Sequence, residues 1–303
     1  MIVAVGLIAS RFLHYLALSL LFGGALFPLY GVAPPRADKQ HVPAWLHAFL
    51  RGAAMLALVS GISWFLFTSA GMSGSLSGIA DPAILSTVIR DTDFGRIWVF
   101  RLLLATGLAV LLLARQVPGW RVDAVLFGSL ILLASIAWTG HAGGDSGPAG
   151  LVHRISDAFH LLAAGVWIGA LVVLARLVMI AVRRLRDDDI ETLHQALSRF
   201  SGVGTIVVAT LVLTGINNPG FLSGFKTGYG QLLLVKLAIF GAMLLLAAAN
   251  RFWLTPRLSA TLNSRSELES AVAALRLSLF AETALAILVL LAVAWMGTLA
   301  PNA

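Results

Sequence analysis

Long apolar segments separated by short polar stretches make up most of this chain. Eight such segments lie at about 3–30, 46–69, 96–115, 123–141, 153–182, 199–218, 230–253 and 275–298. A helix of about 20 apolar residues crosses the hydrocarbon core of a bilayer, so each segment is predicted to be a transmembrane helix. The sequence therefore predicts an all-α integral membrane protein with eight transmembrane helices.

The polar stretches differ in their content of Lys and Arg. Thirteen of these residues flank the odd-numbered loops, whereas four flank the even-numbered loops: Arg90, Arg96, Arg154 and Lys226. Cytoplasmic loops carry the excess of positive charge, so the odd-numbered loops are predicted to be cytoplasmic and both termini periplasmic. The Gly- and Ser-rich stretch at 70–95 is then the longest periplasmic loop.

The two halves of the chain resemble each other. Three stretches recur in the same order: 11–27 and 157–173, 94–102 and 229–237, 135–140 and 292–297. Because the repeating unit contains four spans, its two copies have the same orientation in the membrane. We therefore expect two parallel four-helix repeats, 1–145 and 146–303, which pack around an axis normal to the membrane as one integrated domain.

The repeat makes several polar residues equivalent. His14 matches His160, and each is followed nine residues later by a glycine. Arg11 and Asp157 occupy equivalent positions, as do Arg101 and Lys236. If the two units pack around the expected axis, His14 and His160 face each other in the outer half of the membrane.

Composition supports the membrane class and excludes several functions. Hydrophobic residues make up 59% of the chain and charged residues 12%, which is too apolar for a soluble domain. The net charge of +7 lies beside apolar segments, so it indicates the lipid bilayer as partner and no nucleic acid. With no cysteine, the chain has no thiolate metal site and no covalent c-type haem. No nucleotide-binding motif or convincing catalytic triad is present, so we expect no enzyme.

Imidazoles and one carboxylate form the candidate chemistry. His153, Asp157 and His160 have the spacing i, i+4, i+7, which places them on one helical face. His141 ends the preceding span on the same predicted side, and His14 lies within the first span. Imidazole suits copper, zinc, iron and nickel, so these five residues are predicted metal ligands. The alternatives are interfacial positions for His141 and His153, and a charge-pairing role for Asp157 with an arginine.

Several stretches together resemble the CopD family, the bacterial copper resistance protein D group. They are "FLHYLALSLLFGGALF" (12–27), "WTGHAGG" (138–144), "DAFHLLAAGVWIGAL" (157–171), "RFSGVGTIVVATLVLTGINN" (199–218), "GYGQLLLVKLAIFGAMLLLAAANR" (228–251) and "AETALAILVLLAVAWMGTLAP" (281–301). The resemblance implies an eight-span protein of the bacterial inner membrane that handles copper with a periplasmic copper-binding partner. His14, His141, His160 and also His153 match the family pattern.

Three functions are compatible with this sequence. The first is copper transport or copper delivery through the inner membrane, with copper ion as the ligand. The second is a haem b electron-transfer protein, because two histidines on different spans also hold haem as axial ligands. The third is a scaffolding subunit of a larger assembly, in which the buried histidines have no chemical role.

Overall fold

The computed structural model describes residues 1–31, 44–113, 119–139, 147–216, 227–261 and 265–299. These residues form helices almost throughout and include no β-strand. The elements are α1 (Ile2–Tyr30), α2 (Ala44–Ser73), η1 (Leu76–Ile79), α3 (Pro82–Asp91), α4 (Asp93–Leu113), α5 (Gly119–Ser135), η2 (Ile136–Trp138), α6 (Gly147–Arg184), α7 (Asp187–Ile216), α8 (Gly228–Ala249), η5 (Asn250–Leu254), α9 (Thr255–Ala260) and α10 (Arg265–Met296).

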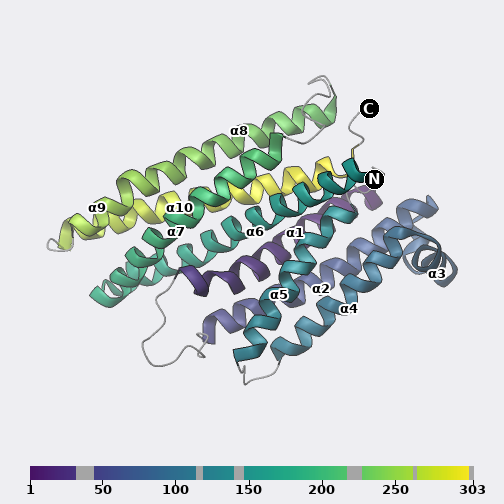
Figure 1. Ribbon diagram of the computed structural model, residues 1–303, viewed down its shortest axis with the longest axis horizontal. Helices are drawn as coiled ribbons and strands as arrows, with labels where there is room; N and C mark the ends of the chain where they lie inside the picture. The colour runs from purple at the N-terminus through teal and green to yellow at the C-terminus, as the bar shows by residue number, and fades with distance from the viewer. Residues whose placement is uncertain (32–43, 114–118, 140–146, 217–226, 262–264, 300–303) are drawn as a thin grey trace.

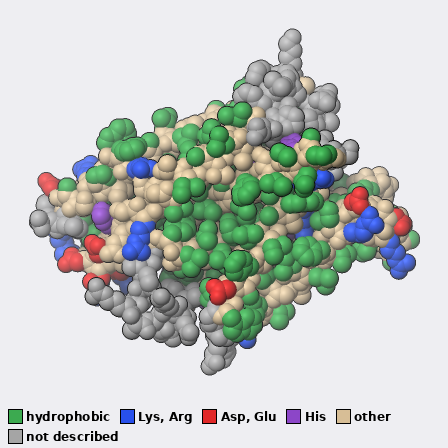
Figure 2. All heavy atoms as spheres, viewed as in Figure 1, with side chains coloured by type: hydrophobic (Ala, Val, Ile, Leu, Met, Phe, Trp, Pro, Cys, Tyr) green, Lys and Arg blue, Asp and Glu red, His purple; other side chains and the backbone are tan. Residues whose placement is uncertain are grey.

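Eight helical stretches of the described chain are long and apolar enough to cross a membrane, which confirms the predicted class and number of spans. They form one elongated bundle (Figure 1). We call the end where α1 and α6 begin the proximal end, and the end where α2 and α7 begin the distal end. Hydrophobic side chains cover the middle of the face in Figure 2, and charged side chains gather mainly toward the two ends.

The distal ends of two helices extend beyond the predicted spans. Helix α7 begins at Asp187 rather than near 199, and α10 begins at Arg265 rather than near 275. The apolar pattern marks only the part of a helix that faces hydrocarbon, whereas helical hydrogen bonding continues into polar surroundings. Three aspartates, 187–189, occupy the first turn of α7, where negative charge interacts favourably with the helix dipole.

The stretch predicted as a long periplasmic loop contains the helices η1 and α3, so a loop throughout 70–95 was wrong. Asp81 caps α3, because its carboxylate accepts hydrogen bonds from the N–H groups of Ala83 and Ile84 at 2.9 and 3.4 Å. Pro82 follows at the first helical position, where its missing N–H costs no helical hydrogen bond. These start signals lie within a stretch whose Gly and Ser content favoured a loop.

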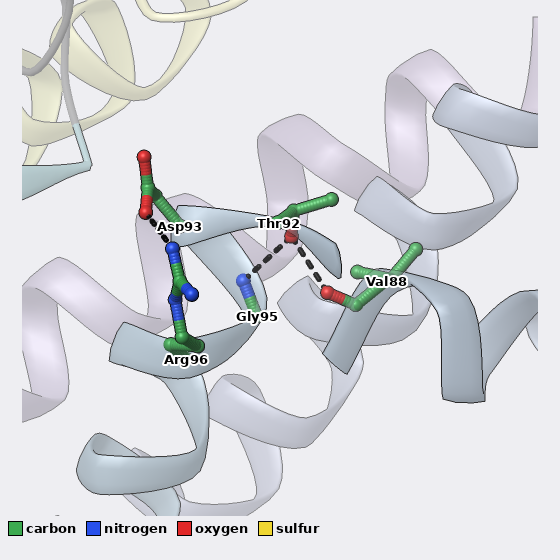
Figure 3. A network of polar contacts seen from close by, with 5 residues as sticks. All are labelled: Val88, Thr92, Asp93, Gly95 and Arg96. Atoms are coloured by element: carbon green, nitrogen blue, oxygen red, sulfur yellow. Dashed lines mark hydrogen bonds and ion pairs between the residues drawn. The ribbon is translucent and has the colours of Figure 1, made fainter. Parts of the chain in front are cut away.

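A short turn joins α3 to α4 (Figure 3). The Thr92 hydroxyl donates to the Val88 carbonyl at 2.6 Å and accepts from the Gly95 N–H at 2.9 Å. Arg96 pairs with Asp93 at the exposed side of the same turn. A Cβ at Gly95 would lie 2.0 Å from the Val88 oxygen, so this junction requires glycine.

Helix neighbours correspond between the two halves of the bundle. Helix α1 packs against α2 and α5, and α6 packs against α7 and α10. The contact between α1 and α10 likewise has a counterpart between α6 and α5. These pairings agree with the expected duplication, and the parallel repeat itself stays a prediction.

The central contact joins α1 and α6 through glycines. A Cβ at Gly23 would lie 2.2 Å from the Gly165 carbonyl oxygen, and a Cβ at Gly169 would lie 2.5 Å from the Gly23 Cα. Backbone therefore touches backbone at this crossing, as small residues allow between membrane helices. Gly23 and Gly169 are the two glycines that follow the repeated histidines at the same spacing.

Candidate metal-binding site

Two cavities lie one above the other between α7 and α8, which are not closely packed in the described part of the chain. The proximal one, here the His160 cavity, has a volume of about 230 Å³ and is lined by Asp157, His160 and Lys236 among apolar side chains. The distal one, here the Glu282 cavity, has a volume of about 250 Å³. Trp167 lines both cavities.

A threonine on α7 fixes the orientation of the His160 ring. The Thr214 hydroxyl lies 2.9 Å from His160 Nδ1 and donates its own hydrogen to the Thr210 carbonyl at 2.6 Å. Thr214 therefore accepts from Nδ1–H, so the lone pair of the imidazole is on Nε2. A histidine held through one nitrogen and free at the other is the usual arrangement of a metal ligand.

His153, Asp157 and His160 follow one another along α6, as the spacing predicts. His153 Nε2 lies 3.9 Å from Asp157 Oδ1, and both side chains are partly buried. Asp157 and His160 line the His160 cavity together. Asp157 also interacts electrostatically with Lys236, so this ammonium group offsets part of the negative charge of the carboxylate. His141 lies outside the described residues.

His14 has the same hydrogen-bonding arrangement in the other half. Its Nδ1 lies 3.1 Å from both the Ala57 carbonyl and the Ser60 hydroxyl, and Ser60 donates its own hydrogen to the Leu56 carbonyl. Nδ1 therefore carries the proton, and Nε2 is buried without a hydrogen-bond partner. Each repeated histidine is thus held by a hydroxyl residue that precedes a glycine, Gly61 or Gly215.

The surroundings of His14 nevertheless differ from those of His160. The rings of Trp64 and Trp98 pack around it with centroids 5.6 and 5.5 Å away. His14 lines neither the His160 cavity, nor the Glu282 cavity, nor the third cavity described below. The guanidinium groups of Arg11 and Arg101 stack on the two indoles at 5.0 Å, so positive charge surrounds this histidine.

His14 and His160 therefore do not face each other, contrary to the expectation from the repeat. His14 points toward α2 and α4, and His160 points into the cleft between α7 and α8. Within the described residues, no group of three or more His, Cys, Asp or Glu side chains is close enough to hold one metal ion. The pairing of these histidines as axial ligands of haem b thus loses its geometric basis.

A third cavity of about 250 Å³ lies between the two halves at the proximal end. Arg11, Tyr15 and Trp64 of the first half line it, together with Tyr229 and Lys236 of the second. Lys236 therefore borders both this cavity and the His160 cavity. Positive charge at the mouth of a cation site disfavours a free cation, and the Asp157 carboxylate offsets part of it.

Sequence reasoning did not single out Ser60, Thr214 or Trp167. A signal for the first two exists in the second span of each half, where a hydroxyl residue, a glycine and an isoleucine follow one another in "SGIS" (60–63) and "TGIN" (214–217). No comparable signal marks Trp167, since its position between two cavities depends on how four helices pack.

The fold and the two oriented histidines define a multi-pass membrane protein with candidate late-transition-metal ligands in its interior. Two family models match the chain: "Copper resistance protein D-like, N-terminal domain" over residues 1–151 and "Copper resistance protein D" over residues 194–296. The chain therefore belongs to the copper resistance protein D family, as its motifs predict.

Curated relatives agree with this assignment. The chain is 35% identical to copper resistance protein D of Pseudomonas syringae pv. tomato, over 97% of this chain and 96% of the relative. It is 31% identical to inner membrane protein YebZ of Escherichia coli K12, over 83% and 85%. It is 28% identical to copper transport protein CutJ of Bacillus subtilis 168, over 86% and 49%. No solved structure matches significantly.

These findings support a copper-related function in a membrane. Eight apolar helices and a relative named as an inner membrane protein fit a multi-pass protein of the inner membrane. Two of these relatives are named as a copper resistance or a copper transport protein rather than as an enzyme.

Proposed function

We propose that this chain transports copper across the bacterial inner membrane or delivers copper into it. The observation that carries the proposal is the His160 cavity, where an imidazole with a free Nε2 lone pair and the Asp157 carboxylate line one space in an apolar interior. Ionisable groups inside a membrane are costly and mark ion pathways. Relatives named for copper resistance and copper transport support copper as the ion.

The face of α6 that carries His153, Asp157 and His160 supports a route of entry from the proximal end. At about 1.5 Å per residue, Asp157 is about 6 Å beyond His153 along the helix, and His160 about 4.5 Å further. Because successive ligands are this close together, a copper ion is able to bind the next ligand before it dissociates from the previous one. We assign the proximal end to the periplasm, and His141 to the same entry region. A periplasmic copper-binding protein is the proposed donor.

His14 belongs to the predicted ligand set but has a separate place in the proposal. As in His160, a hydrogen bond from Nδ1–H to a hydroxyl oxygen leaves the lone pair on Nε2. The charges nearby differ, because Arg11 and Arg101 lie close to His14. The equivalent positions in the second half are Asp157 and Lys236. Net positive charge opposes the approach of a cation. First capture is therefore assigned to His160, and His14 is a second imidazole position.

Copper bound by purified protein in lipid nanodiscs tests this assignment. We expect H160A to lose captured copper and copper uptake in liposomes, and H14A to retain capture. The charge around each site is the reason for the difference. Copper binding and uptake by H160A equal to those of the unchanged protein would refute the proposal.

A variant that leaves every ligand in place tests the cavity itself. Leu233 lines the His160 cavity and occupies the repeat position of Trp98, which packs on His14 in the other half. L233W is therefore expected to fill the cavity and lower copper binding. L234W adds the same indole one residue away, at an exposed position, and serves as the matched control.

A further inference from the structure

Glu282 is a buried carboxylate in the middle of α10, within a membrane span, and only 2% of it is exposed. It lines the Glu282 cavity, distal to the His160 cavity and separated from it by Trp167. Within the described residues, no Lys or Arg side chain forms an ion pair with it. A carboxylate that remains charged in such surroundings is costly, so its position within a membrane span indicates a function.

Two neutral donors hold the Glu282 carboxylate. Trp167 Nε1–H donates to Oε1 at 2.7 Å, and Asn250 Nδ2 donates to Oε2 at 2.9 Å. Hydrogen bonds from neutral groups stabilise the charged form without cancelling its charge. The negative charge of Glu282 is therefore not neutralised by these donors, so the carboxylate is able to bind a cation. The adjoining cavity provides a route by which a cation reaches it.

Asn250 is able to form a hydrogen bond with this carboxyl group in either of its protonation states. It begins the π-helical segment η5, and its Oδ1 is buried without a hydrogen-bond partner. When Glu282 is a carboxylate, the amide Nδ2 donates to it. When Glu282 is protonated, rotation of the amide allows Oδ1 to accept from the new O–H group. One side chain thus satisfies the carboxyl group before and after it binds a proton.

We infer that Glu282 is a proton-exchange site, reached by water from the Glu282 cavity, at the boundary that Trp167 forms between the two cavities. A proton from water in the cavity binds the carboxylate to give the neutral acid, and the same proton returns to water when the site empties. No other reactant is needed. The ligand is a proton rather than copper, because carboxylate and amide oxygens without imidazole suit hard cations.

The charged groups around this site favour that assignment. Arg251 is the other charged residue that lines the Glu282 cavity, and it bonds to Ser201 and Thr205 of α7 instead of Glu282. Across Trp167, the His160 cavity contributes Asp157, His160 and Lys236. The α6 and α7 residues that line the Glu282 cavity have no titratable side chain.

Protonation has a consequence for Trp167. The indole N–H bonds to a full negative charge when Glu282 is ionised, and to a neutral acid when it is not. Charge-assisted hydrogen bonds are about twice as strong as neutral ones, so protonation loosens the indole between the two cavities. The protonation state of Glu282 therefore affects how firmly Trp167 is held between the two cavities.

Infrared spectra of the purified full chain without copper test the inference. As the pH is lowered, we expect the C=O stretch of a buried carboxylic acid to appear, and this band should be absent from E282Q. W167F should retain the band at a shifted frequency, because Oε1 loses its donor. E269Q changes an exposed carboxylate on the same helix and is the matched control. Spectra of E282Q identical to those of the unchanged protein would overturn the inference.

A second measurement needs no variant. Hydrophobic carbodiimides react with protonated carboxyl groups in apolar surroundings, so peptide mapping should find an adduct at Glu282 that increases as the pH falls. Absence of this adduct at every pH would also overturn the inference. Neither measurement involves copper. Loss of copper binding in H160A with the acid band intact therefore separates the two proposals.

Discussion

The glycine crossing of α1 and α6 makes a quantitative prediction for G169A. A Cβ at this position lies 2.5 Å from the Gly23 Cα, 2.6 Å from its carbonyl carbon and 2.8 Å from the Gly24 nitrogen, whereas ordinary contacts begin at 3.4 Å. All three obstacles are backbone atoms, so no side chain is able to rotate away. The two helices must therefore separate by about 1 Å, which forfeits much of the dispersion energy at their contact.

The expected magnitude follows from two opposing effects. Overpacking of a tight interior costs about 1–3 kcal/mol, while replacement of a helical glycine by alanine gains up to about 1 kcal/mol. G241A provides the second effect alone, because no atom lies within 4 Å of a Cβ at Gly241. Because the gain is common to both variants, we expect G169A to be less stable than G241A by about 1–3 kcal/mol. Unfolding of each variant in mixed micelles, titrated with denaturing detergent, measures this difference. Equal stability of the two would refute the close crossing.

Three further predictions concern the hydroxyl partner of a histidine and the proximal helices. T214V keeps the shape of the side chain but removes the acceptor for His160 Nδ1–H, so copper affinity should fall about 10–100-fold in a copper titration; unchanged affinity would contradict the role of this hydroxyl. G95A places a Cβ 2.0 Å from the Val88 oxygen, so proteolysis of the α3–α4 junction should accelerate. D81A removes the cap of α3 at a cost of about 1 kcal/mol, which faster amide exchange in its first turn should reveal.

The number of spans was predictable because the bilayer imposes one requirement on every spanning segment. Each span must satisfy its backbone polar groups internally and expose apolar side chains, which leaves a clear pattern in the sequence. Helix ends were less predictable, since the charged first turns of α7 and α10 lie beyond the apolar pattern. Helix α3 was missed because Gly and Ser around it outweighed the cap at Asp81 and the proline after it.

The candidate site was predictable only in part. Helical spacing placed His153 and Asp157 on one face, and the structure has them 3.9 Å apart. Spacing could not predict which repeated histidine borders a cavity. That difference depends on packing: Trp98 packs on His14, whereas Leu233 occupies the matching position in the other half and leaves space beside His160.

The cleft between α7 and α8 has a consequence for the membrane around the protein. Val212, Ile216 and Leu237 line the His160 cavity and are also exposed on the bundle surface, so this cavity reaches the lipid-facing side. We therefore expect acyl chains of the bilayer to complete its wall. On this expectation, the chain length and unsaturation of the host lipids influence the space beside His160.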